Sequence, residues 1–142
     1  GFAGRRPVSM LRVIFPENTE ETALWEVRAC LNEHRIETFH SACGVEGLCL
    51  LLSSGAEADA LHATAEQLRE RFPDAKVKLR ENLAVLLALC RSTKDIPKLS
   101  AAIEASGAPV HHLVQTPPGA FFCVNDSQYE TALRAAYGAA FG

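Results

Sequence analysis

Residues 75–90, AKVKLRENLAVLLALC, decide the fold because one run of secondary structure ends inside them and another begins. From residue 75 to residue 80, apolar and basic residues alternate, which predicts a half-exposed strand. Residues 83–90 are almost continuously apolar and short, which predicts a buried strand. Two predicted strands in direct succession indicate that a structural unit ends near residue 80 and a second unit starts after it.

Four strands and two helices are predicted before residue 81. Residues 8–15 (VSMLRVIF) predict a strand, since β-branched and apolar residues dominate them, and Pro16 ends it. A helix follows, with Asn18 as its N-cap and Glu21 three residues later. The other elements are strands at 36–42, 48–52 and 75–80, and a helix between the capping box at 54–57 and Pro73.

The same order returns after residue 81. The predicted strand at 83–90 is followed by a helix that Asp95 caps, with Pro97 in its first turn and Gly107 after its end. The remaining elements are strands at 110–115 and 120–124 and a last helix that begins at the capping box 127–130. The two series are offset by about 70 residues, which indicates an internal repeat.

This order predicts an α+β protein made of two tandem ferredoxin-like βαββαβ units. Each unit would be an antiparallel four-stranded sheet with two helices on one face. We expect the first unit to span residues 1–80 and the second 81–142. The second unit lacks a final strand, so either it borrows one or the two units exchange an edge strand.

Composition excludes several classes of function. The 142 residues carry 14 Lys and Arg against 17 Asp and Glu, a net charge of −3 that offers no basic surface for nucleic acid. No apolar run approaches the roughly 18 residues that cross a membrane. The chain opens Gly1-Phe2-Ala3-Gly4 and its one methionine is Met10, so we expect a piece of a longer chain without a signal peptide.

The sequence has no motif of catalysis or of metal binding. It contains no phosphate-binding loop, no nucleophile elbow and no zinc-protease motif, so we expect no catalytic residue, no metal and no cofactor. Its five cysteines include no CxxC pair, which indicates reduced core thiols in a cytoplasmic protein. Trp25 lies just past the apolar stripe of its helix, as a partly buried flank or an interface residue.

Several segments resemble a known regulatory family. Residues 83–89 (LAVLLAL), 122–124 (FCV) and 132–141 (ALRAAYGAAF) resemble the C-terminal regulatory region of aspartate kinases, which is a pair of ACT domains. Residues 110–115 (VHHLVQ) are similar to that family's I-x-x-I-x-Q, and residues 24–36 to its L-A-x-V-F-x-I-L-x-x-H-x-I. The resemblance runs from Val8 to Phe141 and rests on order and spacing more than on any single motif.

The resemblance implies a regulatory role without catalysis by this chain. It implies an amino-acid effector, lysine or threonine, acting on a covalently attached kinase domain within lysine and threonine biosynthesis. Open sheets expose edges, so we also expect a homodimer. The alternative is a free-standing ACT-pair regulator or the regulatory region of another amino-acid metabolic enzyme.

The resemblance also places an effector site between the first predicted helix start and the end of the second strand. It implies these residues: Asn18, Thr19, Glu20, Thr22, Ser41, Cys43 and Val45. The sequence departs from the family there, since Thr22 stands near the family's glycine and Phe39 at its acidic residue.

Charge at this loop favours one effector over the other. Glu17, Glu20 and Glu21 would attract a side-chain ammonium, which favours lysine over threonine, while the amides at the helix start suit a carboxylate. The alternative is that these acids only stabilise the helix start. The loop at 91–95 in the second unit also lacks the family's glycine.

Overall fold

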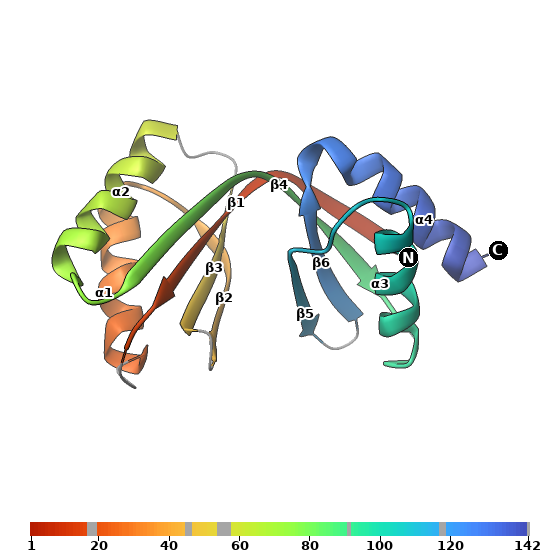
Figure 1. Cartoon of the computed structure of the whole chain (residues 1–142), viewed down its shortest axis with the longest axis horizontal. Coiled ribbons are helices and arrows are strands. Elements are labelled where there is room, and N and C mark those ends of the chain that lie inside the picture. Colours follow the sequence, from red (N-terminus) through yellow and green to blue (C-terminus); the bar gives the residue numbers. More distant parts are fainter. Residues whose placement is uncertain (17–19, 45–46, 54–57, 91, 117–118, 142) are drawn as a thin grey trace. The chain divides into compact units, whose positions relative to one another are not determined.

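The computed structural model describes residues 1–16, 20–44, 47–53, 58–90, 92–116 and 119–141. These residues form two compact units, one made of Val8–Glu81 and the other of Gly1–Pro7 with Asn82–Gly142 (Figure 1). The elements are β1 (Phe2–Ile14), α1 (Glu20–Glu33), β2 (Thr38–Gly44), β3 (Gly47–Leu52), α2 (Ala58–Arg71), β4 (Lys76–Leu89), α3 (Asp95–Ala105), β5 (His112–Thr116), β6 (Gly119–Asn125), η1 (Asp126–Gln128) and α4 (Tyr129–Phe141).

The Val8–Glu81 unit is a four-stranded sheet in the order β2-β3-β1-β4, with α1 and α2 on one face. The pairings of β1 with β3 and of β2 with β3 are antiparallel. Alternate strand residues point toward the helices and meet the apolar stripes of α1 and α2. This core contains Leu11, Val13, Val27, Leu31, Leu48, Leu50, Leu52, Leu61 and Leu68. The predicted ferredoxin-like arrangement is therefore confirmed for this unit.

The second unit has the same arrangement, in the order β1-β4-β6-β5, with α3 and α4 on one face. β4 pairs antiparallel with β6, and β6 pairs antiparallel with β5. Its core lies between the sheet and the two helices and contains Ala84, Leu86, Ala88, Ile96, Leu99, Ile103, Ala120, Phe122, Val124, Ala132 and Ala136. Phe122 is fully buried at its centre.

Two long strands are each divided between the units. β4 joins the predicted strands at 75–80 and 83–90 into one strand of 14 residues, and β1 begins at Phe2 rather than at Val8. The expectation of two separate strands around residue 81 was wrong. Asn82 adopts a φ of 57°, a left-handed conformation that asparagine tolerates better than most residues, so the strand turns at the unit boundary without ending.

The N-terminal segment supplies the strand that the second unit lacks. The N–H of Leu89 donates to the Gly1 carbonyl at 2.9 Å. Arg6 Nε donates to Asp126 Oδ1 at 2.8 Å, and its guanidinium lies 4.9 Å from the centre of the Tyr129 ring. Of the two alternatives left open, borrowing is therefore what the structure shows. The grouping differs from the predicted 1–80 and 81–142 at residues 1–7 and at Glu81.

Aromatic side chains fasten the start of this strand to α4. The Phe2 ring centre lies 4.7 Å from that of Tyr137 and 6.4 Å from that of Phe141. Gly4 passes so close to the Tyr129 hydroxyl that a Cβ there would overlap it. Sequence patterns missed this strand because Gly1-Phe2-Ala3-Gly4-Arg5-Arg6 has neither an apolar run nor a clean alternation.

The structure describes two of the four predicted helix starts, and one of them has a different N-cap from the predicted one. Asp95 is not the N-cap of α3, since Lys94 holds that position and Asp95 lies in the first turn. The reason is a turn before the helix, in which the Asp95 N–H donates to the Ser92 carbonyl and the Lys94 N–H to Ser92 Oγ. Asn18 and residues 54–57 lie outside the described residues, and the box at 127–130 spans the end of η1 and the start of α4.

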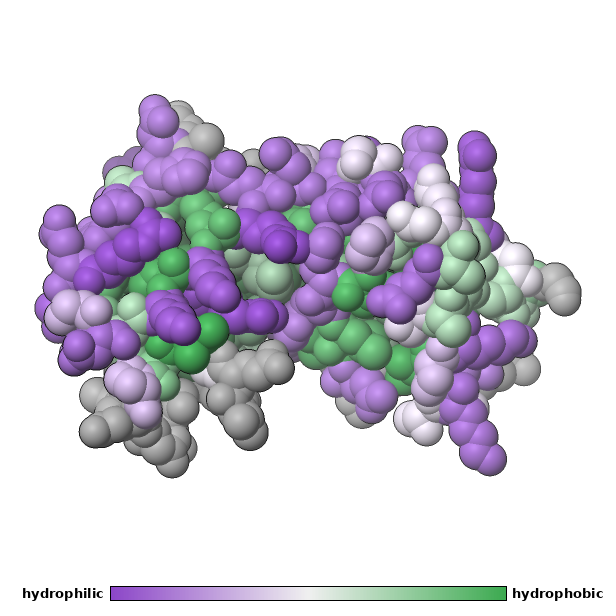
Figure 2. Space-filling view, in the orientation of Figure 1, coloured by the Kyte–Doolittle hydropathy of each residue, from purple (hydrophilic) through white to green (hydrophobic). Residues whose placement is uncertain are grey.

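The outer surface of the first unit is polar along α2, as Figure 2 shows, and its exposed positions include His62, Glu66, Arg69 and Glu70. Over the residues that the structure describes, no helix combines the length and the apolar character needed to span a bilayer.

Candidate functional site

Strand register brings the two predicted effector segments to one end of the Val8–Glu81 unit. Val13 of β1 and Cys43 of β2 both pair with Leu48 of β3, so the three residues form one row across the sheet. β1 ends one residue later at Ile14, and α1 begins at Glu20 after the connecting loop. The C-terminal ends of β1 and β2 and the start of α1 therefore meet at the same edge.

Among the predicted site residues, Ser41 has a side chain that the structure describes, and this side chain forms a hydrogen bond with α1. It pairs with Leu50 on the helix-facing side of the sheet, where its hydroxyl accepts a hydrogen bond from Arg28 Nη2 at 2.6 Å. Arg28 lies on α1, two turns after the helix begins. The contact holds β2 against α1 next to the predicted effector loop.

Sequence reasoning missed Arg28, although a signal for it exists. Arg28 follows Leu24 by four residues and precedes Leu31 by three, which puts it beside the apolar stripe that packs on the sheet. A long cationic side chain at that position reaches the edge strand, where Ser41 offers a hydroxyl.

The other predicted site residues are placed only in part. Asn18, Thr19 and Val45 lie outside the described residues. The structure places the backbone of Glu20 and Thr22 in the first turn of α1 and that of Cys43 near the end of β2.

Trp25 does not have the partial burial that one interpretation of the sequence expected. Its side chain is 73% exposed on α1. The residue lies outside the stripe formed by Val27, Cys30 and Leu31, so packing against the sheet leaves it in solvent.

Three of the cysteines are buried thiols. Cys30, Cys49 and Cys123 are buried and reduced, and burial raises the pKa of the Cys30 thiol, so it stays protonated near neutral pH. Over the described part of the chain, no three His, Cys, Asp or Glu side chains gather as metal ligands.

No protein-family model matches the sequence, and no curated protein matches it. Solved structures do match its fold. Aspartate kinase from Clostridium acetobutylicum shares 15% sequence identity and a TM-score of 0.82, over 98% of this chain and 34% of that one. The ligand-free regulatory subunit of aspartate kinase from Thermus thermophilus shares 19% identity and a TM-score of 0.75, over 98% of this chain and 97% of the subunit.

The fold is thus a pair of ferredoxin-like units, with the second unit completed by the N-terminal strand. This fold is similar to that of the regulatory subunits of aspartate kinases. It is shared by E. coli aspartokinase III in complex with lysine and aspartate, at 18% identity and a TM-score of 0.71, over 99% of this chain and 33% of the kinase. The chain therefore spans about a third of the length of the whole kinases and nearly all of the separate regulatory subunit.

Proposed function

We propose that this chain is the amino-acid-sensing regulatory region of an aspartate kinase and has no catalytic activity of its own. The observation that carries the proposal is the structural match over nearly the whole of a regulatory subunit, 98% of this chain and 97% of the subunit. The convergence of the β1 end, the α1 start and the β2 end supports an effector site at that edge.

Lysine is the effector that the charges favour. The first N–H groups of α1 have no partner within the helix and suit a carboxylate. The sequence adds three acidic residues, Glu17, Glu20 and Glu21, within five positions of this helix start. A lysine side-chain ammonium gains from these acids, whereas threonine has no second cationic group to place there.

Strand β1 offers a route from the effector to the rest of the chain. Its last residues precede the effector loop, and its first residues form the completing strand of the second unit. An effector that draws the loop toward Ser41 acts on one end of a strand whose other end Arg6 and Phe2 hold in place. In a longer chain, a displacement of β1 would be transmitted to a kinase domain joined before Gly1.

Titration with lysine and threonine tests the effector. We expect saturable lysine shifts in NMR spectra of the 142-residue chain at residues 20–22 and 41–43, with weaker binding of threonine. Replacing Glu20 and Glu21 with glutamine should weaken lysine binding about two- to fivefold per charge and leave threonine nearly unchanged. Glu104→Gln and Glu130→Gln on the other unit are the matched controls. No shifts at millimolar lysine, or shifts confined to residues 82–141, would contradict the proposal.

A coupled ADP-release assay tests the non-catalytic assignment. With ATP and aspartate, the purified chain should release no ADP above the rate without protein, because the sequence carries no phosphate-binding loop. An aspartate kinase of known activity is the positive control. Aspartate-dependent ADP release that survives repurification would overturn the assignment.

A second candidate is a separate regulatory subunit, which the 97% coverage of the Thermus thermophilus subunit favours. In either case we propose a cytoplasmic homodimer. The edge strands β2 and β5 have one sheet neighbour each and are suited to pairing with a second copy. Retention of an aspartate kinase catalytic chain on the immobilised 142-residue chain would favour the separate subunit over a fused region.

A further inference from the structure

The first half of β4 carries a row of basic side chains that the proposed effector site does not use. Within residues 76–81, Val77 belongs to the core of the Val8–Glu81 unit and Leu79 packs against that core, so both face the helices. Side chains alternate between the two faces of a strand, so Lys76, Lys78 and Arg80 form a basic row on the opposite face. All three residues of the basic row are exposed.

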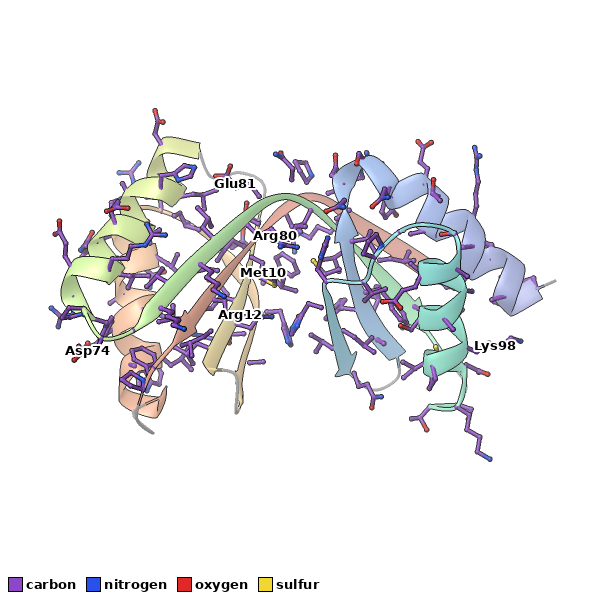
Figure 3. The ribbon with its side chains drawn as sticks, in the orientation of Figure 1. Met10, Arg12, Asp74, Arg80, Glu81 and Lys98 are labelled. Atoms are coloured by element: carbon purple, nitrogen blue, oxygen red, sulfur yellow. The ribbon has the colours of Figure 1, made fainter. Side chains whose placement is uncertain are left out.

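Arg12 adds a positive charge on the neighbouring strand. Its neighbours Leu11 and Val13 belong to the core that faces the helices, so Arg12 points the other way. β1 lies next to β4 in the sheet. Figure 3 shows Arg12 and Arg80 on the side of these two strands that faces away from α1 and α2, whereas Asp74 lies on the side of the helices.

The ion pairs described in this unit lie on its helix side. They are Arg71–Glu26, Arg69–Glu66 and His62–Glu81. Among the residues that the structure describes, no carboxylate pairs with Lys76 or Lys78. Positive charges gathered on one face attract an anionic partner.

The same stretch of β4 is an edge of the sheet of this unit. β1 lies on one side of β4, and the pairing with β6 on the other side covers residues 83–89. In the described part of the chain, no strand pairs with residues 76–81 on that second side. The Val77 carbonyl accepts a hydrogen bond from Arg69 Nη2 at 3.1 Å, so a donor from outside the sheet reaches the backbone here.

We propose that residues 76–81 bind an extended acidic segment of a partner protein, which adds to this sheet as a further strand. Alternate side chains of an extended chain lie about 7 Å apart, so carboxylates at every second position match the spacing of the basic row. Backbone hydrogen bonds supply affinity, and the charge pairs across the strands select an acidic sequence. Positive charge at an edge disfavours the pairing of two identical edges, so a second copy of β4 is not the occupant. The proposal does not depend on the proposed effector.

NMR titration of the 142-residue chain with synthetic peptides tests the proposal. The probe is a short peptide in which glutamate alternates with threonine. One comparison peptide has the same composition with its glutamates grouped at one end, and another has lysine in place of glutamate. We expect saturable shifts at residues 76–81, with the alternating peptide binding about fivefold or more tightly than the grouped one, and no binding of the lysine peptide.

Charge variants test the role of the basic row. The triple variant Lys76→Gln, Lys78→Gln and Arg80→Gln should weaken binding of the alternating peptide about tenfold or more, because each charge pair across two strands contributes about two- to fivefold. The matched control is the triple variant Lys94→Gln, Lys98→Gln and Arg134→Gln, which removes exposed cations of the other unit and should leave the affinity nearly unchanged.

Hydrogen exchange separates strand addition from attraction between charges alone. Along an edge strand, backbone groups of every second residue point outward, so the Leu79 N–H lies on the same side as the Val77 carbonyl. The alternating peptide should slow exchange of the Leu79 amide about tenfold or more. Unchanged exchange at Leu79, equal binding of the grouped peptide or of single-stranded oligothymidylate, or an affinity that survives the triple variant of the basic row would each overturn the proposal.

Discussion

Deletion of residues 1–7 should unfold the second unit while the first stays folded. The deletion removes one of the four strands of that sheet, together with the Arg6–Asp126 ion pair and the packing of Phe2 on α4. We expect amide protection at Phe122 and Val124 to fall by about a thousandfold or more, since a sheet that loses a strand exposes its core. Protection at Leu48 and Leu50, in the other core, should change little.

A point variant checks that the effect comes from the docked strand and not from chain length. Gly4→Val keeps all 142 residues but puts a side chain where the Tyr129 hydroxyl lies. It should lower protection in the same unit, less than the deletion does because Tyr129 can turn aside. Unchanged protection of β6 after the deletion would show that residues 1–7 are not part of this unit.

Replacing Gly47 with alanine should be among the most destabilising single changes in the first unit. Gly47 has a φ of +92°, which side chains rarely adopt, and an added Cβ would overlap the Val13 carbonyl and lie 2.9 Å from the Ile14 Cα. Backbone cannot move aside as a flexible side chain can. Strain and overlap together should cost about 2–5 kcal/mol of unfolding free energy, measured by urea denaturation.

Gly107→Ala is the matched control for this substitution. Gly107 has a nearly equal φ of +96°, but a Cβ there meets no atom within 4 Å. It should cost about 1–2 kcal/mol, which is the backbone strain alone. The difference between the two variants isolates the contact of position 47 with β1, and equal losses of unfolding free energy would mean that this contact contributes nothing.

The backbone segments of the candidate site could be predicted before the structure was known. The side-chain contact between Arg28 and Ser41 could not. The family resemblance implied a site between the loop after residue 15 and the end of the strand at 36–42, and the Val13–Leu48–Cys43 row brings the ends of those two strands to one edge of the sheet. Arg28 was not predicted because its partner, Ser41, is 13 residues away in the sequence. The angle at which α1 packs on the sheet determines which strand residue Arg28 contacts. No local pattern contains that angle.

The repeated order of helices and strands and the apolar stripes that form the two cores could be predicted from the sequence alone. Those properties follow from hydrophobic periodicity and turn residues, which act over a few neighbouring positions. That β4 is one strand and that Gly1–Pro7 completes the second sheet became visible in the three-dimensional structure. The strand pairing joins residues about 90 positions apart, such as Gly1 and Leu89. Its backbone hydrogen bonds stabilise the sheet only once the two strands lie side by side, so no local sequence pattern reveals them.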